Sequence, residues 1–377
     1  MCSEKKVSKP LEVSPMRIER LETYTQRHLS LVKVITDDGA QGIGQISAYD
    51  ADISALVFHR LVAPVALGED PMDLDMLVDR IMVETFKYPG SFVCRALAGL
   101  DTAIWDLRGK LEGKSVCELL GGEPCDLIPY GSSMSRQITP KKEAERLVRF
   151  RDDFGYRSFK IRIGKENGHD QDEWPGRTEE LVPTVRRAIG NEIDLKVDAN
   201  SCYTPTKAIK VSKLLQDNGV SHFEEPCPYW ELDWTAEVTG ATNISVAGGE
   251  QDYDLKQWER MTAAHVMDIA QPDVCYIGGI TRAMHAAKMA EQAGMPFVPH
   301  SANLSLVTVF TMHLLAATPN RGPHFEFCIE EEPWFEDLYT PTLQVSDGRV
   351  RIPEGPGWGV EINPRWLANA ELKVSVL

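Results

Sequence analysis

The sequence predicts an α/β chain in which a parallel (β/α)-barrel of the TIM type follows a smaller α+β unit. The N-terminal third shows strand periodicity and then helical periodicity, which is typical of an α+β unit. From Leu127 onward, short apolar runs alternate with longer amphipathic stretches, as parallel strands and their connecting helices do. The chain has 377 residues, of which 43% are hydrophobic. That length accommodates a barrel of about 250 residues beside a smaller domain.

The N-terminal unit is predicted to begin with antiparallel strands. Apolar and polar residues alternate through Met16–Arg27 and again through Ser30–Ile35. Asp37-Asp38-Gly39 then precedes Gly42-Ile43-Gly44, and this composition is typical of a tight turn between two strands. We therefore expect a small sheet over residues 16–48.

Helices are predicted to follow over residues 51–120. Apolar residues recur three and four positions apart within Ala96–Leu107, and the helical pattern stops at Gly121-Gly122. We place the boundary of this α+β capping domain at residue 125. Residues 1–15 are polar and lack the apolar core of a signal peptide, so we expect them to form a loose leader.

Eight short apolar runs predict the barrel strands between residues 126 and 340. The runs are Leu127–Gly131, Ser158–Ile163, Asp194–Val197, His222–Phe223, Ser245–Ala247, Met267–Ile269, Phe297–Val298 and His324–Phe327. Helical stretches lie between them. Residues 341–377 form a third segment, in which alternation from Leu343 through Ile362 surrounds Asp347-Gly348. We expect this segment to form a hairpin that returns to the capping domain.

The composition excludes several classes of function. A net charge of −16 and a pI near 5.1 oppose binding to nucleic acid, although they do not exclude a small anionic substrate beside a bound cation. No run of 18 apolar residues occurs, so no membrane span is expected. The eight cysteines form no CxxC pair and are expected to be reduced thiols of a cytoplasmic protein.

Three acidic residues, Asp198, Glu224 and Glu250, each follow a predicted barrel strand. Successive members are 26 residues apart, which matches the interval between neighbouring strands of such a barrel. Three carboxylates that converge would repel one another unless a cation neutralised them, and oxygen ligands of this kind suit Mg²⁺. The alternative is three solvated carboxylates in loops.

Two cations, Lys160 and Arg162, alternate with apolar residues in one predicted strand. With a period of two, both side chains point to the same side, where they need an anion. A substrate carboxylate and a metal site would supply it, although an ion pair at the strand end is the alternative.

Asp273 and His300 follow two neighbouring predicted strands on the other side of the barrel. A carboxylate that binds one imidazole nitrogen fixes the tautomer and raises the basicity of the other nitrogen. We expect a catalytic dyad, while a structural histidine is the alternative. Glu326 ends the last strand. It would donate a hydrogen bond to the substrate as a protonated acid, or would be a paired structural carboxylate.

These motifs together resemble the enolase superfamily, and within it the mandelate racemase-like group. The resemblance covers essentially the whole chain. It rests on Asp37-Asp38-Gly39 with Gly42-Ile43-Gly44, Ala98–Asp106, Lys160-Ile161-Arg162, Val197-Asp198-Ala199-Asn200, Phe223-Glu224-Glu225-Pro226, Gly248-Gly249-Glu250, Gln271-Pro272-Asp273 and Pro299-His300.

The resemblance implies a modified (β/α)₇β barrel, covered by the capping domain, and a symmetric homo-oligomer. It implies one Mg²⁺ per subunit, held by Asp198, Glu224 and Glu250. It also implies that Asp273 and His300 act as base or acid. Glu326 is then a hydrogen-bond donor to the substrate carboxylate.

Two positions depart from the pattern of the group. Many members have Lys-x-Lys, in which the second lysine is a base, but the second position here is Arg162. Arginine is a poor base, so a two-base racemase is disfavoured. Gln45 replaces a common glutamate, and we expect it to affect specificity or capping contacts rather than the chemistry.

We therefore expect a dehydratase of a sugar acid, in which His300 removes the proton beside the carboxylate and the β-hydroxyl leaves. Lys160 and Arg162 would hold the substrate or stabilise the enolate. The polar residues expected to contact the substrate are Tyr24, Arg27, His28, Tyr49 and Asn200.

Two other functions remain open. The same enolate serves racemisation, epimerisation or cycloisomerisation, with Lys160 as a second base. A metal-binding relative with a scaffold or regulatory role is the other alternative, which the intact acidic set and dyad disfavour.

Overall fold

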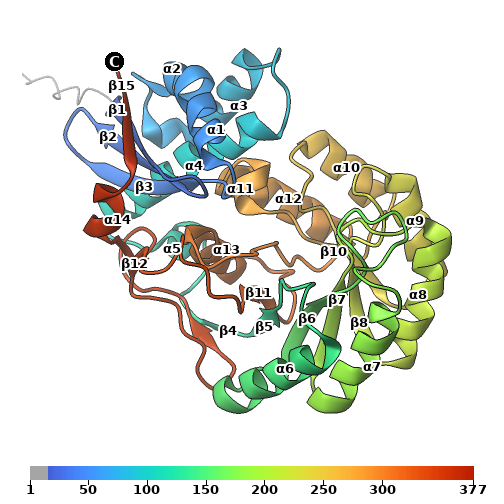
Figure 1. The fold of residues 1–377 in the computed structure, drawn as a ribbon. Helices are drawn as coiled ribbons and strands as arrows, with labels where there is room; N and C mark the ends of the chain where they lie inside the picture. The colour runs from blue at the N-terminus through green and yellow to red at the C-terminus, as the bar shows by residue number, and fades with distance from the viewer. Residues whose placement is uncertain (1–15) are drawn as a thin grey trace, which may run out of the picture.

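The computed structural model describes residues 16–377, so the predicted leader lies outside the described residues. It has two parts, a capping unit and a parallel barrel, which Figure 1 shows side by side. The predicted fold class is confirmed, with strands first and helices next in the capping unit and alternating strands and helices in the barrel.

The capping unit contains a four-stranded antiparallel sheet in the order β15-β1-β2-β3. Its strands are β1 (Ile18–Thr25), β2 (Ser30–Thr36), β3 (Gln41–Ile46) and β15 (Glu371–Val376). Its helical segments are α1 (Ala51–Val57), a π-helical turn η1 (Phe58–Val62), α2 (Ala63–Ala66), a 3₁₀ turn η2 (Pro71–Asp73), α3 (Leu74–Glu84), α4 (Ser91–Glu112) and α5 (Val116–Leu119).

The long helix α4 packs directly on strand β3. A Cβ atom at Gly42 would overlap the backbone of Ala103, and one at Gly44 would overlap Thr102. Glycine at these two positions therefore allows the helix and strand backbones to approach closely. The same strand contains Gln45, which is fully buried. Its side chain donates to Ser305 and accepts from the Leu306 amide, so it joins the capping sheet to the barrel.

The barrel contains a seven-stranded parallel sheet in the order β10-β9-β8-β7-β6-β5-β11. Its strands are β5 (Pro129–Ser132), β6 (Ser158–Arg162), β7 (Asp194–Asp198), β8 (Val220–Glu224), β9 (Ser245–Gly248), β10 (Ile269–Ala270) and β11 (Phe325–Cys328). The helices are α6 (Pro140–Phe154), α7 (Arg177–Ile189), α8 (Pro205–Asp217), α9 (Leu232–Ala241), α10 (Leu255–Ala263), α11 (Val274–Ile277), α12 (Ile280–Gln292) and α13 (Leu306–Ala316). Strand β11 pairs with β5 and not with a sequence neighbour, so the sheet curls toward closure.

Two predicted strand runs differ from the structure. The run at Phe297–Val298 forms no extended strand, and Phe297 makes only isolated bridges with Ala270 and Arg321. The first run is divided, because β4 (Asp126–Leu127) pairs outside the barrel and only β5 belongs to the parallel sheet.

The C-terminal segment contacts the capping unit in two places. Trp358 donates from its indole nitrogen to the Thr102 carbonyl of α4 at 3.0 Å. Strand β15 is an edge strand of the capping sheet and pairs with β1, beside which Figure 1 draws it. The predicted hairpin around Asp347-Gly348 instead lies against the barrel, where the Gly348 amide donates to the Phe154 carbonyl. The remaining elements here are β12 (Tyr339–Thr340), β13 (Val350–Arg351), β14 (Glu361–Ile362) and α14 (Pro364–Ala368).

Among residues 16–377, no single helix has both the length and the apolar composition of a membrane span. A bent pair over Ala51–Ala66 and Pro71–Glu84 meets these two criteria only when both arms are counted together.

Candidate active site

Three buried carboxylates meet at the carboxyl ends of neighbouring strands. Asp198 and Glu224 are the last residues of β7 and β8 and lie in register, and Glu250 follows β9 by two residues. One oxygen from each lies within 4.8 Å of the others. Their exposed fractions are 0%, 1% and 7%, which excludes the alternative of solvated loop carboxylates.

This set of donors fits a hard divalent cation. Three buried carboxylates so close together repel one another, and oxygen ligands of this number suit Mg²⁺ while leaving positions open for water or substrate. Asp198, Glu224 and Glu250 are thus the residues that could hold the ion.

Lys160 lies on the cavity side of β6 and is fully buried. Its ammonium lies 2.6 Å from Glu224 Oε1, 2.7 Å from Glu326 Oε1 and 3.8 Å from Asp198 Oδ2. Burial by itself lowers the pKa of Lys160, but the carboxylates of Glu224 and Glu326 raise it above the ordinary range. The charged ammonium is therefore the favoured form of this side chain beside these carboxylates.

Arg162 lies two residues further along β6, on the same side of the strand. It forms an ion pair with Asp198 and donates to Asn200 Oδ1 at 2.8 Å. Both cations of this strand thus lie against carboxylates of the predicted metal site, as the need for an anion at this side of the strand predicted.

The imidazole of His300 faces the three carboxylates from the other side of the barrel. Asp273 Oδ2 lies 2.8 Å from His300 Nδ1, and Glu250 Oε2 lies 3.5 Å from His300 Nε2. Asp273 is itself fixed, because its Oδ1 accepts the amide hydrogens of Cys275 at 2.7 Å and Tyr276 at 3.0 Å. The predicted pair therefore exists as a geometric unit, with Nε2 turned toward the cavity.

The charges around His300 act in opposite directions on its pKa. Burial lowers it, but Glu250, the hydrogen bond to Asp273 and the charge of Glu326 raise it to about 10. Glu250 is one of the carboxylates that a cation would neutralise. With a cation bound, Glu250 would raise the pKa of His300 less, and the imidazole would move toward the neutral form that a base requires.

Glu326 has the geometry of a paired carboxylate. Its Oε1 accepts from Ser132 Oγ at 2.7 Å and lies beside Lys160, and its Oε2 accepts from the Ser301 amide at 2.7 Å. Burial raises its pKa, but Lys160 and His300 together lower it to about 2. In this structure Glu326 thus has the contacts of a paired carboxylate, and its role as a hydrogen-bond donor to the substrate stays a prediction.

A cavity of about 560 Å³ opens above these groups. Of the predicted substrate contacts, Tyr49 and Asn200 line it, together with Glu250, His300 and Arg162. Residues that the sequence reasoning missed also line it, and they include Arg136, Glu166, Glu225, Tyr229, Trp230 and Tyr276.

Glu225 is the most unusual of these missed residues. It is buried, and its Oε1 atom has no hydrogen-bond partner among the described residues. Burial, followed by the charges of Glu250 and Glu224, raises its pKa well above the ordinary value. Its position directly after Glu224 was the available signal in the sequence, because strand-end loops face the mouth of a barrel.

Three of the predicted substrate contacts, Tyr24, Arg27 and His28, are not among the residues that line this cavity. The Tyr24 hydroxyl donates to Glu22 at 2.6 Å within the capping sheet. Arg27 is exposed, and the ring of His28 lies 6.1 Å from that of Trp334. Arg27 and His28 nevertheless lie beside Tyr49, because the Tyr49 amide donates to the His28 carbonyl and the Ala51 amide to the Arg27 carbonyl, and their contact with substrate stays a prediction.

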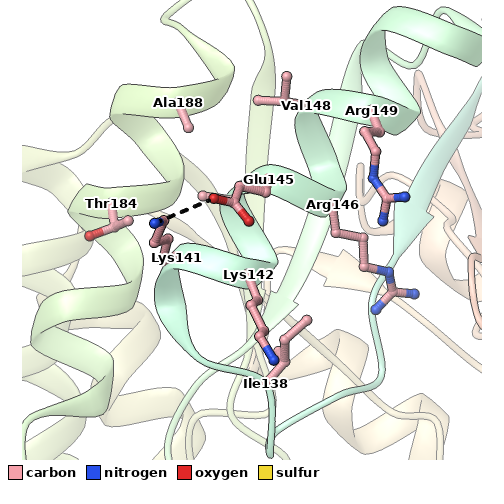
Figure 2. Close-up of a pocket in the computed structure, with 10 residues that line it drawn as sticks. Ile138, Lys141, Lys142, Glu145, Arg146, Val148, Arg149, Thr184 and Ala188 are labelled. Atoms are coloured by element: carbon pink, nitrogen blue, oxygen red, sulfur yellow. Dashed lines mark ion pairs between the residues drawn. The ribbon is translucent and has the colours of Figure 1, made fainter.

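A second hollow lies on the outside of the barrel, between helices α6 and α7. Figure 2 shows the basic side chains of Lys141, Lys142, Arg146 and Arg149 around it, with Lys141 paired to Glu145. It brings no carboxylate cluster or imidazole together. We therefore assign the chemistry to the cavity at the strand ends.

Two family models cover most of the chain. Residues 2–121 match the N-terminal domain of mandelate racemases and muconate lactonizing enzymes, and residues 142–366 match the enolase C-terminal domain-like family. The chain belongs to the mandelate racemase/muconate lactonizing enzyme family of the enolase superfamily. The resemblance seen in its motifs is thus confirmed.

Relatives within this family differ in their named activities. A crystal structure of a putative racemase from Roseobacter denitrificans is 54% identical, has a TM-score of 0.94, and covers 96% of this chain and 100% of its own. The D-galactarolactone cycloisomerase of Agrobacterium fabrum is 30% identical over 96% of this chain and 94% of its own length. The arabinonate dehydratase of Saccharolobus solfataricus is 26% identical over 88% and 87%.

Proposed function

We propose that this protein is a Mg²⁺-dependent dehydratase that converts a sugar acid, an aldonate or an aldarate, to a 2-keto acid. The observation that carries the proposal is the single dyad of His300 and Asp273 opposite Arg162, which stands where family members have a second base. One imidazole serves elimination as base and then as acid, whereas proton transfer between two faces of a carbon needs two bases. The named activity of the arabinonate dehydratase supports the same reaction class.

Asp198, Glu224 and Glu250 would hold the magnesium ion. When bound, the cation neutralises the negative charge that develops on the substrate carboxylate as the neighbouring proton leaves. The ammonium of Lys160 adds a second fixed positive charge beside Glu224 and Glu326.

His300 takes the proton on the α-carbon at its Nε2 atom. Asp273 Oδ2 accepts the hydrogen on His300 Nδ1, with 2.8 Å between the oxygen and the nitrogen. The lone pair of the neutral ring is then on Nε2. Because Asp273 is anchored by two backbone amides, the ring keeps its orientation toward the cavity.

The elimination then follows in two steps. The C–H bond at the α-carbon breaks, its proton goes to His300, and its electron pair is delocalised into the carboxylate as an enolate. That electron pair next forms the α,β double bond while the β-carbon–oxygen bond breaks, and the proton on His300 leaves with the hydroxyl as water. The resulting enol takes a proton at the β-carbon and releases the proton of the hydroxyl on the α-carbon, which gives the 2-keto acid.

A screen against paired aldonic and aldaric acids tests the proposal. The Mg²⁺-loaded protein is incubated with each acid, and 2-keto acid is measured with a carbonyl reagent. We expect turnover of at least one acid, and a loss of roughly 10²–10⁴-fold in kcat for His300→Asn. Unchanged dehydration by that variant would contradict the assigned base.

A second candidate is an isomerase that uses the same enolate. The 30% identical cycloisomerase and the 54% identical putative racemase favour it. Cycloisomerisation also needs only one base, so Arg162 does not exclude it. The mass of the product in D₂O distinguishes the two, because an isomerase product keeps the composition of the substrate apart from exchanged deuterium, whereas dehydration removes the elements of one water molecule.

A further inference from the structure

Two guanidinium groups converge on one neutral oxygen atom in the cavity wall. Arg136 and Arg162 both donate to Asn200 Oδ1, at 2.6 and 2.8 Å. Arg136 comes from the loop after β5, and Asn200 from the loop after β7. All three residues line the cavity. Two like charges so close together, with only a carboxamide between them, favour the binding of an anion.

The two arginines differ in how their charges are balanced. Arg162 forms an ion pair with Asp198. Arg136 has no carboxylate in ion-pair contact within residues 16–377, and its Nε atom is buried without a hydrogen-bond partner. Burial, and then the charge of Arg162, lowers the pKa of Arg136 to about 10, while the more distant carboxylates of Glu166 and Glu173 act in the opposite direction, so the group stays charged at neutral pH. Arg136 is half-buried, and a partly desolvated guanidinium without an ion-pair partner is stabilised by a ligand that supplies the counter-charge.

The loop that carries Arg136 is held from both sides. Gln137 donates to Glu173 at 2.8 Å. Arg177, which is fully buried, donates to the Arg162 carbonyl at 2.9 Å and to the Ser135 carbonyl at 3.5 Å. The two guanidinium groups are therefore positioned before any ligand arrives, which reduces the entropic cost of binding one.

We propose that Arg136 binds a second carboxylate of the substrate, so that the enzyme acts on aldarates in preference to aldonates. Arg162 and Asn200 separate Arg136 from the three metal-binding carboxylates. One substrate carboxylate thus reaches the metal site while the carboxylate at the other end of the sugar chain pairs with Arg136, with two N–H donors in the geometry that guanidinium groups offer. This inference rests on the proposed sugar-acid function and narrows it to dicarboxylates.

Matched substrate pairs test the inference. Values of kcat/KM are measured for acids that differ only at the far end, such as D-gluconate and D-glucarate or D-galactonate and galactarate. The variants are Arg136→Met and Arg136→Lys, with Arg149→Met as control. Arg149 is an exposed arginine of the outer hollow, so that control removes the same charge elsewhere (Figure 2). Mg²⁺ affinity and thermal unfolding of each variant verify that the site and the fold persist.

The native protein is expected to prefer the dicarboxylate by at least ~100-fold, and Arg136→Met is expected to lose that preference mainly through a higher KM. Arg136→Lys should recover part of it, and Arg149→Met should match the native protein. Preference for the aldonate, or an equal loss on both members of a pair in Arg136→Met, would overturn the inference. If no acid is dehydrated, calorimetric binding of the same pairs decides. Dicarboxylate binding that Arg136→Met abolishes retains the subsite while the dehydratase proposal fails, and equal binding of both acids overturns the subsite.

Discussion

His313 lies where three parts of the chain meet, and we predict that its titration makes the stability of the protein fall at acid pH. The residue belongs to α13, and its ring is fully buried. Nδ1 accepts the Cys117 amide hydrogen at 3.1 Å, and Nε2 donates to the Trp358 carbonyl at 3.2 Å. These two bonds fix the neutral ring with its hydrogen on Nε2. The pKa of His313 is lowered to about 4, and burial is the main cause of this shift.

The magnitude follows from the difference in pKa between the folded and unfolded chains. An unfolded histidine titrates near 6.5, so below that pH the unfolded state of the chain binds a proton that folded His313 refuses. The stabilising contribution is therefore complete above pH 6.5 and is lost as the pH falls toward 4. At pH 5 the loss is about 2 kcal/mol, from about 1.4 kcal/mol for each pH unit.

Urea unfolding of the native protein and of His313→Gln at pH 7.5 and pH 5 measures this loss. A glutamine amide can accept from Cys117 and donate to Trp358 without titrating. We expect the native protein to lose about 2 kcal/mol more than the variant between the two pH values. Other buried histidines, such as His59, are present in both proteins and cancel in the difference. An equal loss in both proteins would refute the assigned pKa and its cause.

Three further predictions concern the site and its attachment to the cap. Asp273→Asn should lower kcat by roughly 10²–10⁴-fold with little change in KM, because the amide does not hold the Nδ1 hydrogen of His300; steady-state rates and deuterium exchange at the α-carbon measure this. Glu250→Gln should weaken Mg²⁺ binding by at least ~100-fold and abolish the rise in melting temperature that Mg²⁺ is expected to give the native protein. Calorimetry measures both quantities, and an unchanged affinity would remove Glu250 from the ligand set. Asp101→Ala should lower the free energy of unfolding by about 1–3 kcal/mol in urea, because Asp101 Oδ1 accepts the Ile280 amide hydrogen at the start of α12 at 2.6 Å. A loss no larger than that caused by an alanine substitution of an exposed carboxylate would contradict this role.

The sequence predicted the barrel well where strand and helix periods alternate cleanly, and less well where proline interrupts a run. Phe297 and Val298 are apolar, but Pro296 and Pro299 flank them and have no backbone N–H to donate to a ladder. The structure accordingly shows only isolated bridges at Phe297. The predicted return of the C-terminal segment to the capping domain is confirmed by β15, although the strand that pairs with β1 lies beyond the predicted hairpin.

Within the site, the residues at strand ends could be predicted and those in loops could not. Asp198 and Glu224 end their strands, so parallel register alone brings them together. Arg136 lies in a loop without periodicity, and only the tertiary structure places it beside Asn200. Tyr24 was expected to contact substrate, but its hydroxyl donates to Glu22 in the capping sheet, a partner that alternation along a strand does not reveal.

The arginine at position 162 connects these observations. A lysine there would be a compact point charge that can lose its proton, as a second base must. The guanidinium of Arg162 instead contacts both Asp198 and Asn200, and Asn200 in turn contacts Arg136. In the mechanism that we propose, arginine at this position leaves no base on that face of the substrate and places a guanidinium in the cavity wall that leads toward Arg136. One-base elimination and recognition of a second carboxylate then depend on the same replacement, so Arg162→Lys should weaken the preference for dicarboxylates and also restore proton exchange at the opposite face.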